Sequence, residues 1–172
     1  MKPQKITYIG SFPPPYGGVT VKNALLCRHL AKRLKVEKLD LTQSKRLTFH
    51  VICCLLHAVL SRNGSLVLGV SGKWRFRLTC ILYYFNRTKM RQSLLVVMGG
   101  DTPKDAAYVK RMNEYRRVYV ETEGMKQSLE QIGANNVAIY PNCRERPAEF
   151  DEVAGKEFML TKPVDDSIKV IK

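Results

Sequence analysis

Residues 9–20 read IGSFPPPYGGVT, and this stretch decides how the chain begins to fold. Its three prolines fix φ and reduce the freedom of a loop, and Gly17 and Gly18 follow at once. Because glycine has no Cβ, it allows a backbone to approach a ligand closely. An apolar run at 5–10 precedes the loop, and a helical pattern over 18–34 follows it. The stretch therefore predicts a stiffened turn between a first strand and a first helix. Its two glycines leave backbone accessible to a ligand such as phosphate.

Apolar runs of strand length recur along the chain and alternate with helical patterns. Several of these runs are continuous, which is typical of strands covered on both faces. We therefore expect an α/β, Rossmann-like, doubly wound fold with a mostly parallel sheet of about six strands. The predicted strands are 5–10, 36–41, 65–70, 93–99, 117–122 and 136–140. The first loop then lies at the carboxyl edge of the sheet, where open α/β folds bind ligands and a helix start favours an anion. The alternative is a tight turn without a ligand.

A second turn at the same edge is SLLVVMGGDTPKD, residues 93–105. We expect Thr102 to cap a helix that begins at a proline, with an acidic residue three positions after the cap. Gly99, Gly100 and Asp101 then form a loop at the site. We expect Asp101 to act as the catalytic polar group that orients a substrate hydroxyl, and the alternative is a turn aspartate that binds nearby backbone.

A third turn is VETEGMKQSLEQIGANNVAIYPN, residues 120–142. Thr122 or Glu123 opens a helix that Gly133 ends. The apolar residues predicted to pack inward from this helix are Met125, Leu129 and Ile132. We expect Thr122 mainly to cap the helix, and a substrate-binding role for Thr122 and Glu123 remains the alternative.

The charge of the chain is strongly one-sided. The 172 residues carry 29 lysines and arginines against 15 acidic residues, a net charge of +14. Residues 1–100 hold 17 basic and 2 acidic side chains, whereas residues 101–172 hold 12 and 13. Such a field attracts an anionic partner: a membrane surface, a diphosphate or a nucleic acid. The alternative is a basic surface that serves only solubility.

The stretch GKWRFRLTCILYYFNRTKMRQ, residues 72–92, combines two faces of a helix. One stripe is predicted to join the core and contains Trp74, Leu78, Ile81, Leu82 and Phe85. The other side is basic and aromatic, which suits an anionic membrane surface or an acceptor. The residues predicted for that surface are Lys73, Arg75, Arg77 and Arg87. The alternatives are stacking on a single-stranded nucleic acid and a helix that is buried on two sides.

Several classes of protein are excluded by composition. The five cysteines form no CxxC pair and no even set, so a disulfide framework is not expected and a reducing cytoplasm is the default. We expect neither a signal peptide nor a bilayer-spanning segment.

HVICCLLH at 50–57 superficially resembles a zinc set with His50, Cys53, Cys54 and His57. Four ligands on one helix rarely converge on one tetrahedral centre, so we expect no metal and no cofactor. The opposite face of that helix is instead predicted to enter the core through Val51, Ile52, Leu55, Leu56 and Val59.

Three stretches together resemble the amino-terminal half of a family 4 glycosyltransferase, one of the group 1 enzymes with the GT-B fold. They are ITYIGSFPPPYGGVTVKNALLCRHLAKR at 6–33, SLLVVMGGD at 93–101 and VYVETEGMKQSLEQIGANNVAIYPN at 118–142. The resemblance covers about residues 4–145. It departs from the family's pattern where Met98 to Asp101 replace a frequent histidine, and where Pro-Asn-Cys at 141–143 replaces Pro-Asn-Gly.

The resemblance implies retaining transfer of a sugar from a nucleotide-sugar donor to a saccharide or lipid-diphosphate acceptor, usually without a metal. It also implies an acceptor-binding domain at 1–145 and a linker at 146–172 that leads into a donor-binding domain not contained in this chain. On this basis we expect the chain alone to be inactive and to belong to the cytoplasm, at the inner face of the membrane. The substrate contacts are expected at Tyr16, Gly17, Gly18, Val19, Gly99, Gly100, Thr122 and Glu123. The alternatives are a non-enzymatic α/β module that binds a nucleotide or phosphate, and a nucleic-acid-binding protein, for which no motif exists beyond charge.

Overall fold

The computed structural model describes residues 5–42, 49–61, 64–99 and 102–140. Strands and helices alternate through almost all of this range. The elements are β1 (Lys5–Gly10), α1 (Gly18–Ala31), β2 (Lys35–Asp40), α2 (Phe49–Leu60), β3 (Ser65–Val70), α3 (Gly72–Phe85), α4 (Arg87–Arg91), β4 (Leu94–Val97), α5 (Ala106–Met112), β5 (Arg117–Val120), α6 (Glu123–Gln131) and β6 (Val137–Ile139).

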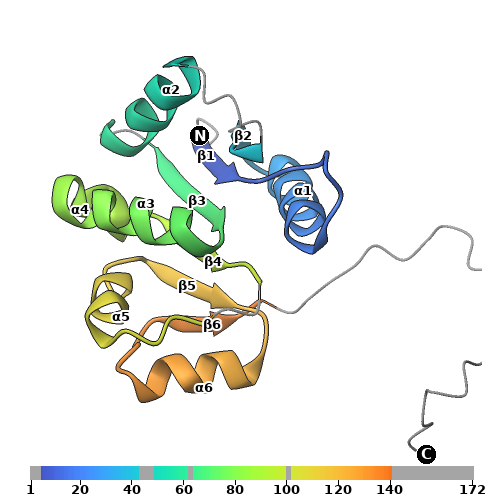
Figure 1. Cartoon of the computed structure of the whole chain (residues 1–172). Helices are drawn as coiled ribbons and strands as arrows, with labels where there is room; N and C mark the ends of the chain where they lie inside the picture. Colours follow the sequence, from blue (N-terminus) through green and yellow to red (C-terminus); the bar gives the residue numbers. More distant parts are fainter. Residues whose placement is uncertain (1–4, 43–48, 62–63, 100–101, 141–172) are drawn as a thin grey trace, which may run out of the picture.

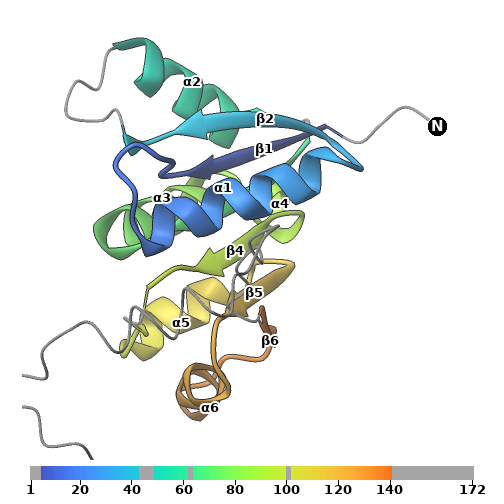
Figure 2. The same cartoon turned by 90° about the vertical axis from the view of Figure 1, so that its right-hand side faces the viewer.

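The six strands form one sheet in the order β2-β1-β3-β4-β5-β6, and every neighbouring pair is parallel. From β1 the chain moves outward to β2 and then returns past β1 to β3. Because such crossovers are right-handed, α1 covers one face of the sheet, while α2, α3 and α5 cover the other (Figures 1 and 2). The predicted α/β, doubly wound, Rossmann-like fold is therefore confirmed.

The strand predictions hold best where apolar runs are continuous. β1 and β3 have the predicted bounds, and β3 is buried from its second residue to its last. The later strands are shorter than predicted, because β4 ends at Val97 and β5 ends at Val120. Gly99 has a φ of +78°, which turns the chain away from the strand direction. α1 likewise ends at Ala31 rather than at residue 34.

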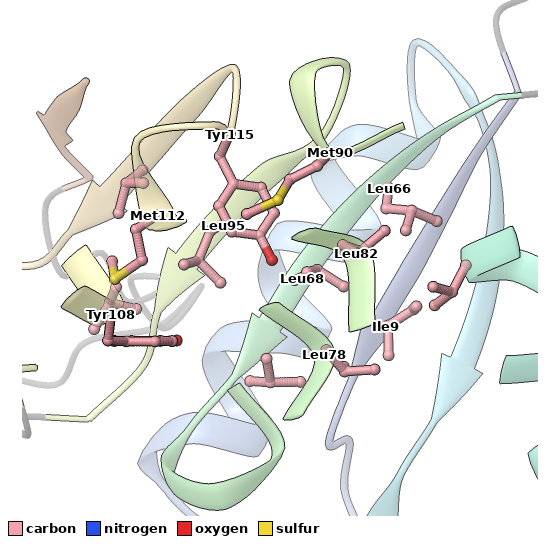
Figure 3. Packing of buried hydrophobic residues seen from close by; sticks show 14 of the residues in the cluster. Ile9, Leu66, Leu68, Leu78, Leu82, Met90, Leu95, Tyr108, Met112 and Tyr115 are labelled. Atoms are coloured by element: carbon pink, nitrogen blue, oxygen red, sulfur yellow. The ribbon is translucent and has the colours of Figure 1, made fainter. Parts of the chain in front are cut away.

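The larger core lies between the sheet and the helices α2, α3, α5 and α6. Leu78 and Leu82 of α3 are fully buried in it, as predicted, and they pack with Leu68, Leu95 and Met112 (Figure 3). The predicted core role of Phe85 is wrong, because that side chain is 75% exposed at the end of α3. Leu78 and Leu82 already occupy the line of α3 that reaches the sheet.

Helix α6 follows its prediction. Leu129 is fully buried, and Met125 and Ile132 pack against the same core. Gly133 follows the helix with a φ of +95°, a conformation that favours glycine.

The smaller core lies under α1 on the other face of the sheet. It contains Tyr8, Phe12, Val67, Val96 and Met98, with Leu26, Cys27, Leu30 and Leu34 packed against it from α1 and the residues after it. The periodicity of residues 18–34 predicts Ala31 on the same apolar face, but its side chain is exposed.

The predicted core face of α2 is only partly correct. Leu55 and Val59 are buried, but Ile52 and Leu56 are exposed, and so is Leu60 one turn further on. The side chains of His50 and Val51 lie outside the described residues. Cys53 and His57 face outward, and the described part of the chain contains no group of three or more His, Cys, Asp or Glu side chains that could hold a metal.

No helix in the described ranges combines the length and the apolarity that crossing a membrane requires. The predicted linker at 146–172 falls outside the described residues.

Candidate functional site

β1 and β3 are neighbours in the sheet. After β1 the chain continues to a helix on one face of the sheet, and after β3 it continues to a helix on the other face, so the strand order reverses between these two strands. The loop after β1 leads to α1, and the turn after β3 leads to α3. Open α/β sheets bind ligands in the crevice that such a reversal creates at the carboxyl edge. The candidate site is therefore built around the starts of α1 and α3, which both lie at that edge (Figure 2).

Asn23 fixes α1 above this reversal. Its side chain is fully buried, and its Nδ2 donates to the carbonyl oxygens of Ser11 at 2.9 Å and Gly69 at 2.8 Å. Its Oδ1 accepts from the hydroxyl of Tyr8 at 2.7 Å. A Cβ at Gly69 would lie 2.6 Å from the Tyr8 hydroxyl and would also collide with Asn23. Any larger residue at this position would therefore force the side chains of Asn23 and Tyr8 to move.

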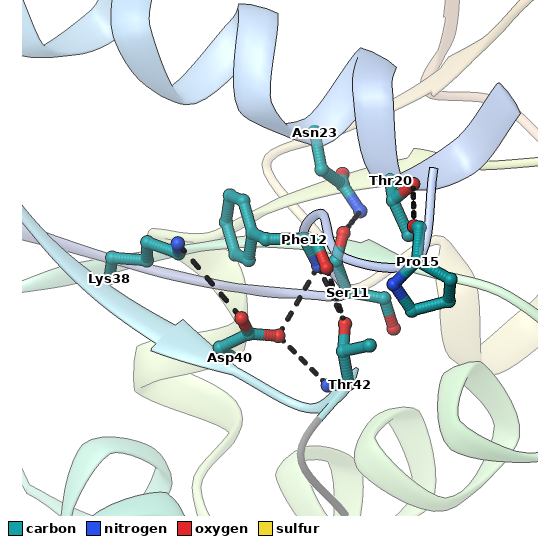
Figure 4. A network of polar contacts seen from close by, with 8 residues as sticks. All are labelled: Ser11, Phe12, Pro15, Thr20, Asn23, Lys38, Asp40 and Thr42. Carbon is teal, nitrogen blue, oxygen red and sulfur yellow. Dashed lines mark hydrogen bonds and ion pairs between the residues drawn. The ribbon is translucent and has the colours of Figure 1, made fainter. Parts of the chain in front are cut away.

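The proline-containing loop is held from below by the end of β2 (Figure 4). The backbone N–H of Phe12 donates to Asp40 Oδ1 at 3.2 Å and to Thr42 Oγ1 at 2.8 Å, and Thr42 Oγ1 donates to the carbonyl of Phe12 at 2.9 Å. At the other end of the loop, Thr20 Oγ1 donates to the carbonyl of Pro15 at 2.9 Å. These contacts hold both ends of the loop in place.

The predicted glycine patch lies at the start of α1. Gly17 is the N-cap in extended backbone, and Gly18 is the first helical residue, with nothing within 4 Å of where its Cβ would be. Neither glycine has a positive φ, so the turn itself does not require them. Tyr16 stands next to them and is 84% exposed, whereas Val19 turns inward and packs against the smaller core. Only the backbone of Val19 is left to meet a ligand.

The start of α3 was not predicted as part of the site, although VSGK after β3 carries a signal like that of the first loop. Ser71 is the N-cap, and Gly72 has a φ of +53° with open space around its missing Cβ. Among the described residues, neither α1 nor α3 has an acidic side chain in its first turn or an N-cap side chain that accepts from the helix N–H groups. In α1, Thr20 Oγ1 accepts from the N–H of the N-cap residue Gly17 at 2.9 Å, which leaves the N–H groups of Gly18 and Val19 without a side-chain cap. Three shorter helices in the described ranges do have such side-chain caps: Asn86 for α4, Asp105 for α5 and Thr122 for α6.

Lys22 and Glu121 form the best-buried ion pair of the site. Lys22 Nζ lies 2.7 Å from Glu121 Oε1, and the two side chains are 18% and 14% exposed. Lys22 stands one turn into α1, and Glu121 follows β5 directly. The pair thus joins the first and third predicted turns across the smaller core. The sequence alone does not indicate this contact, because the periodicity of residues 18–34 places Lys22 on the basic face of the helix, away from its apolar residues.

The other residues predicted for the site are either outside the described ranges or make contacts within their own loop or helix. Gly99 has open space at its Cβ position, but Gly100 and Asp101 lie outside the described residues. Thr122 caps α6 by accepting from the N–H of Met125 at 3.2 Å, as predicted. Glu123 lies 3.7 Å from Lys126 within the same helix.

The predicted cap of the fifth helix is wrong. α5 begins at Ala106 rather than at Pro103, and Asp105 is its N-cap, accepting from the N–H of Ala107 at 2.9 Å. A carboxylate at the N-cap provides the same hydrogen bond as a threonine, so the helix begins three residues later than Thr102 suggested.

Arg75 is a second correction, because it is 95% buried and cannot belong to an exposed surface. It lies in the first turn of α3 and faces the interior beside Tyr108 of α5. The hydroxyls of Tyr108 and Tyr115 are each 3.1 Å from Thr79 Oγ1. Burial raises the pKa of Tyr108 and Tyr115, so both phenols stay protonated through neutral pH. The other predicted surface cations, Lys73, Arg77 and Arg87, are exposed as expected.

A hollow of about 800 Å³ lies elsewhere, between α2 and the outer strands β1 and β2. It is lined by Lys5, Glu37, Cys54 and Ser61 and lies toward the amino edge of the sheet. This hollow does not include the starts of α1 and α3. No family model, curated protein or solved structure matches the chain.

Proposed function

We propose that this chain is the acceptor-binding half of a retaining glycosyltransferase, which transfers a sugar from a nucleotide-sugar donor to a saccharide or lipid-diphosphate acceptor. The observation that carries the proposal is the pair of helix starts at the strand-order reversal whose N-cap residues provide no side-chain cap, with open space at Gly18 and Gly72. Free backbone N–H groups and the positive end of a helix dipole favour a diphosphate.

The departing nucleotide diphosphate gains negative charge as the sugar leaves. Backbone N–H groups at Gly18 and Val19 would stabilise this charge, because fixed donors need no reorganisation at the moment of reaction. The ion pair of Lys22 and Glu121 would hold the first turn of α1 at a fixed distance from the loop after β5. Donor and acceptor must be held together for transfer, and the carboxyl edge of the sheet would receive the acceptor.

The described carboxylates near this edge are all engaged in contacts within the chain. Glu121 pairs with Lys22, Asp40 accepts from the backbone of Phe12, and Asp105 caps α5. We therefore expect the 172-residue chain to show no sugar transfer, with the donor sugar and ribose bound by groups outside it. Turnover of UDP-glucose or GDP-mannose by the purified chain would contradict this assignment.

Chemical-shift mapping of the ¹⁵N-labelled chain tests the site directly. Pyrophosphate and UDP are expected to shift the amide signals of Gly18, Val19, Gly72 and Lys73. Gly18→Val is the blocking variant, because its side chain would occupy the open space above the first turn. Shifts confined to the hollow beside α2, or none at all, would contradict the proposal. Binding of UDP without binding of any saccharide or lipid-diphosphate acceptor would favour a non-enzymatic phosphate-binding module instead.

A further inference from the structure

Helix α2 carries an apolar stripe that the sheet does not cover. Ile52, Leu56 and Leu60 are spaced four residues apart and are 40%, 44% and 48% exposed. The residues of α2 that line the hollow beside β2 are Cys53, Cys54, His57 and Ala58, together with Ser61 directly after the helix. By helical periodicity, the stripe lies on the flank of the helix away from that hollow.

Helix α3 contributes to the same surface. α2 and α3 contact each other on one face of the sheet (Figure 1). Asn86 Nδ2 donates to the carbonyl of Val59 at 3.0 Å and lies 3.3 Å from that of Leu60. This contact brings the end of α3, with Phe85 at 75% exposure, next to the end of α2. We call the surface formed by Ile52, Leu56, Leu60 and Phe85 the α2–α3 face.

Exposed cations lie on α3 and at the start of α4. Arg77 of α3 and Arg87 of α4 are both exposed, and the Cζ of Arg87 lies 4.0 Å from the centroid of the Tyr83 ring. The sequence from residue 41 to residue 100, which contains α2, β3, α3, α4 and β4, has no aspartate or glutamate at all. The elements that build this face thus offer no carboxylate that could neutralise these cations.

We propose that the α2–α3 face docks on an anionic lipid bilayer. The apolar side chains would enter the boundary between headgroups and acyl chains, while the exposed cations contact lipid phosphates. The positive charge near this face favours an anionic bilayer over a second copy of the chain, because two copies would bring the same cations against one another. The inference is independent of the proposed function, since it involves the opposite side of α3 from the sheet and not the carboxyl edge.

Co-sedimentation of the whole chain with vesicles tests the proposal. Vesicles of phosphatidylcholine with about one third phosphatidylglycerol are compared with pure phosphatidylcholine, at low and at high salt. We expect binding only to the anionic vesicles, and a marked loss at high salt because exposed charges are screened. Arg77→Gln combined with Arg87→Gln should weaken binding about 25-fold, at about fivefold for each cation. Lys32→Gln combined with Arg33→Gln removes two exposed cations beyond α1 and is the matched control, expected to change binding little.

The apolar contribution is tested separately by Leu56→Ser. It should weaken vesicle binding about tenfold, whereas Val21→Ser, at a 45% exposed position of α1, should not. Melting temperatures of all variants show whether the fold survives, and a loss of binding that follows a loss of folding counts against the proposal. Equal binding to neutral vesicles, equal effects of the control variants, self-association through Leu56, or tighter binding to single-stranded RNA than to vesicles would each overturn it.

Discussion

Lys22 Nζ lies 2.7 Å from Glu121 Oε1 although 99 positions separate the two residues in the chain. The pair connects the amino-terminal part of α1 with the end of β5, and both side chains are mostly buried. A partly desolvated pair of this kind is costly to break, because the remaining charge keeps its burial without its partner. The relationship therefore links the stability of the domain to the geometry of its carboxyl edge.

The first prediction concerns this pair. Lys22→Met should lower the free energy of unfolding by about 1–3 kcal/mol, because it leaves the Glu121 carboxylate without its cation. Glu121→Gln in the same chain should restore part of the loss. Urea unfolding of both single variants and the double variant gives the coupling energy, which is expected to exceed about 0.5 kcal/mol. Strict additivity of the two changes would show that the pair is not coupled.

The second prediction compares two glycines. Gly18→Val should leave the melting temperature nearly unchanged, because Gly18 has no positive φ and open space at its Cβ position. Gly133→Val should destabilise by at least about 2 kcal/mol, because its φ of +95° is strained for a β-branched residue. Thermal unfolding of the two variants measures the difference.

The same Gly18→Val variant separates a turn requirement from a ligand requirement. If the first turn of α1 binds a diphosphate, pyrophosphate affinity should fall at least about tenfold, as expected for the loss of a hydrogen bond to a charged group. Unchanged affinity in the folded variant would reject the role of Gly18, and Gly133→Val at low temperature serves as the control for a change far from the site.

The fold could be predicted from the sequence because its signals are local. Continuous apolar runs identified the strands, and the glycine at 133 and the threonine at 122 marked the ends of α6. The predictions that failed depended on competition between neighbours. Asp105 replaced Thr102 as the cap, and Phe85 lost its core position because Leu78 and Leu82 reach the sheet first.

The candidate site could be predicted only in part, for a physical reason. Glycines after strands announced the carboxyl edge, but no local pattern reveals that Lys22 meets Glu121 or that Arg75 turns inward beside Tyr108. Contacts of this kind depend on which helix lies next to which strand. The strand order determines these neighbours, and no single segment of the sequence encodes the strand order.

The third prediction concerns the glycine under α1. Gly69→Ala should destabilise the domain by about 1–3 kcal/mol, because the new methyl group collides with Asn23 and the Tyr8 hydroxyl. Asn23→Ala should cost a similar amount, because it leaves the buried Tyr8 hydroxyl without its acceptor. The double variant should cost less than the sum of the two, since the shortened side chain makes room for the methyl group. A cost equal to the sum in urea unfolding would contradict the steric explanation.

The last prediction is a loss of stability in alkali. Burial raises the pKa of Tyr8 and Tyr115 well above the usual value for tyrosine. Their protonated forms are therefore favoured in the folded state, and the contribution is fully present below about pH 10, where the unfolded chain is also protonated. Above this pH the unfolded chain releases protons that the folded chain retains. Each of the two tyrosines should then lower the free energy of unfolding by about 1.4 kcal/mol per pH unit.

Tyr115→Phe isolates one of these contributions. Buried Lys89 acts in the opposite direction, since burial lowers its pKa and stability rises with pH up to about 10.4 as that proton is lost in both states. Because Lys89 is present in both proteins, the difference between wild type and Tyr115→Phe removes its effect. We expect the slope of stability against pH between 10 and 12 to become shallower by about 1.4 kcal/mol per unit. Tyr16→Phe, at an exposed position, is the control and should keep the wild-type slope. Equal slopes for wild type and Tyr115→Phe would mean that Tyr115 titrates alike in the folded and unfolded chain, and that its burial does not hold the proton.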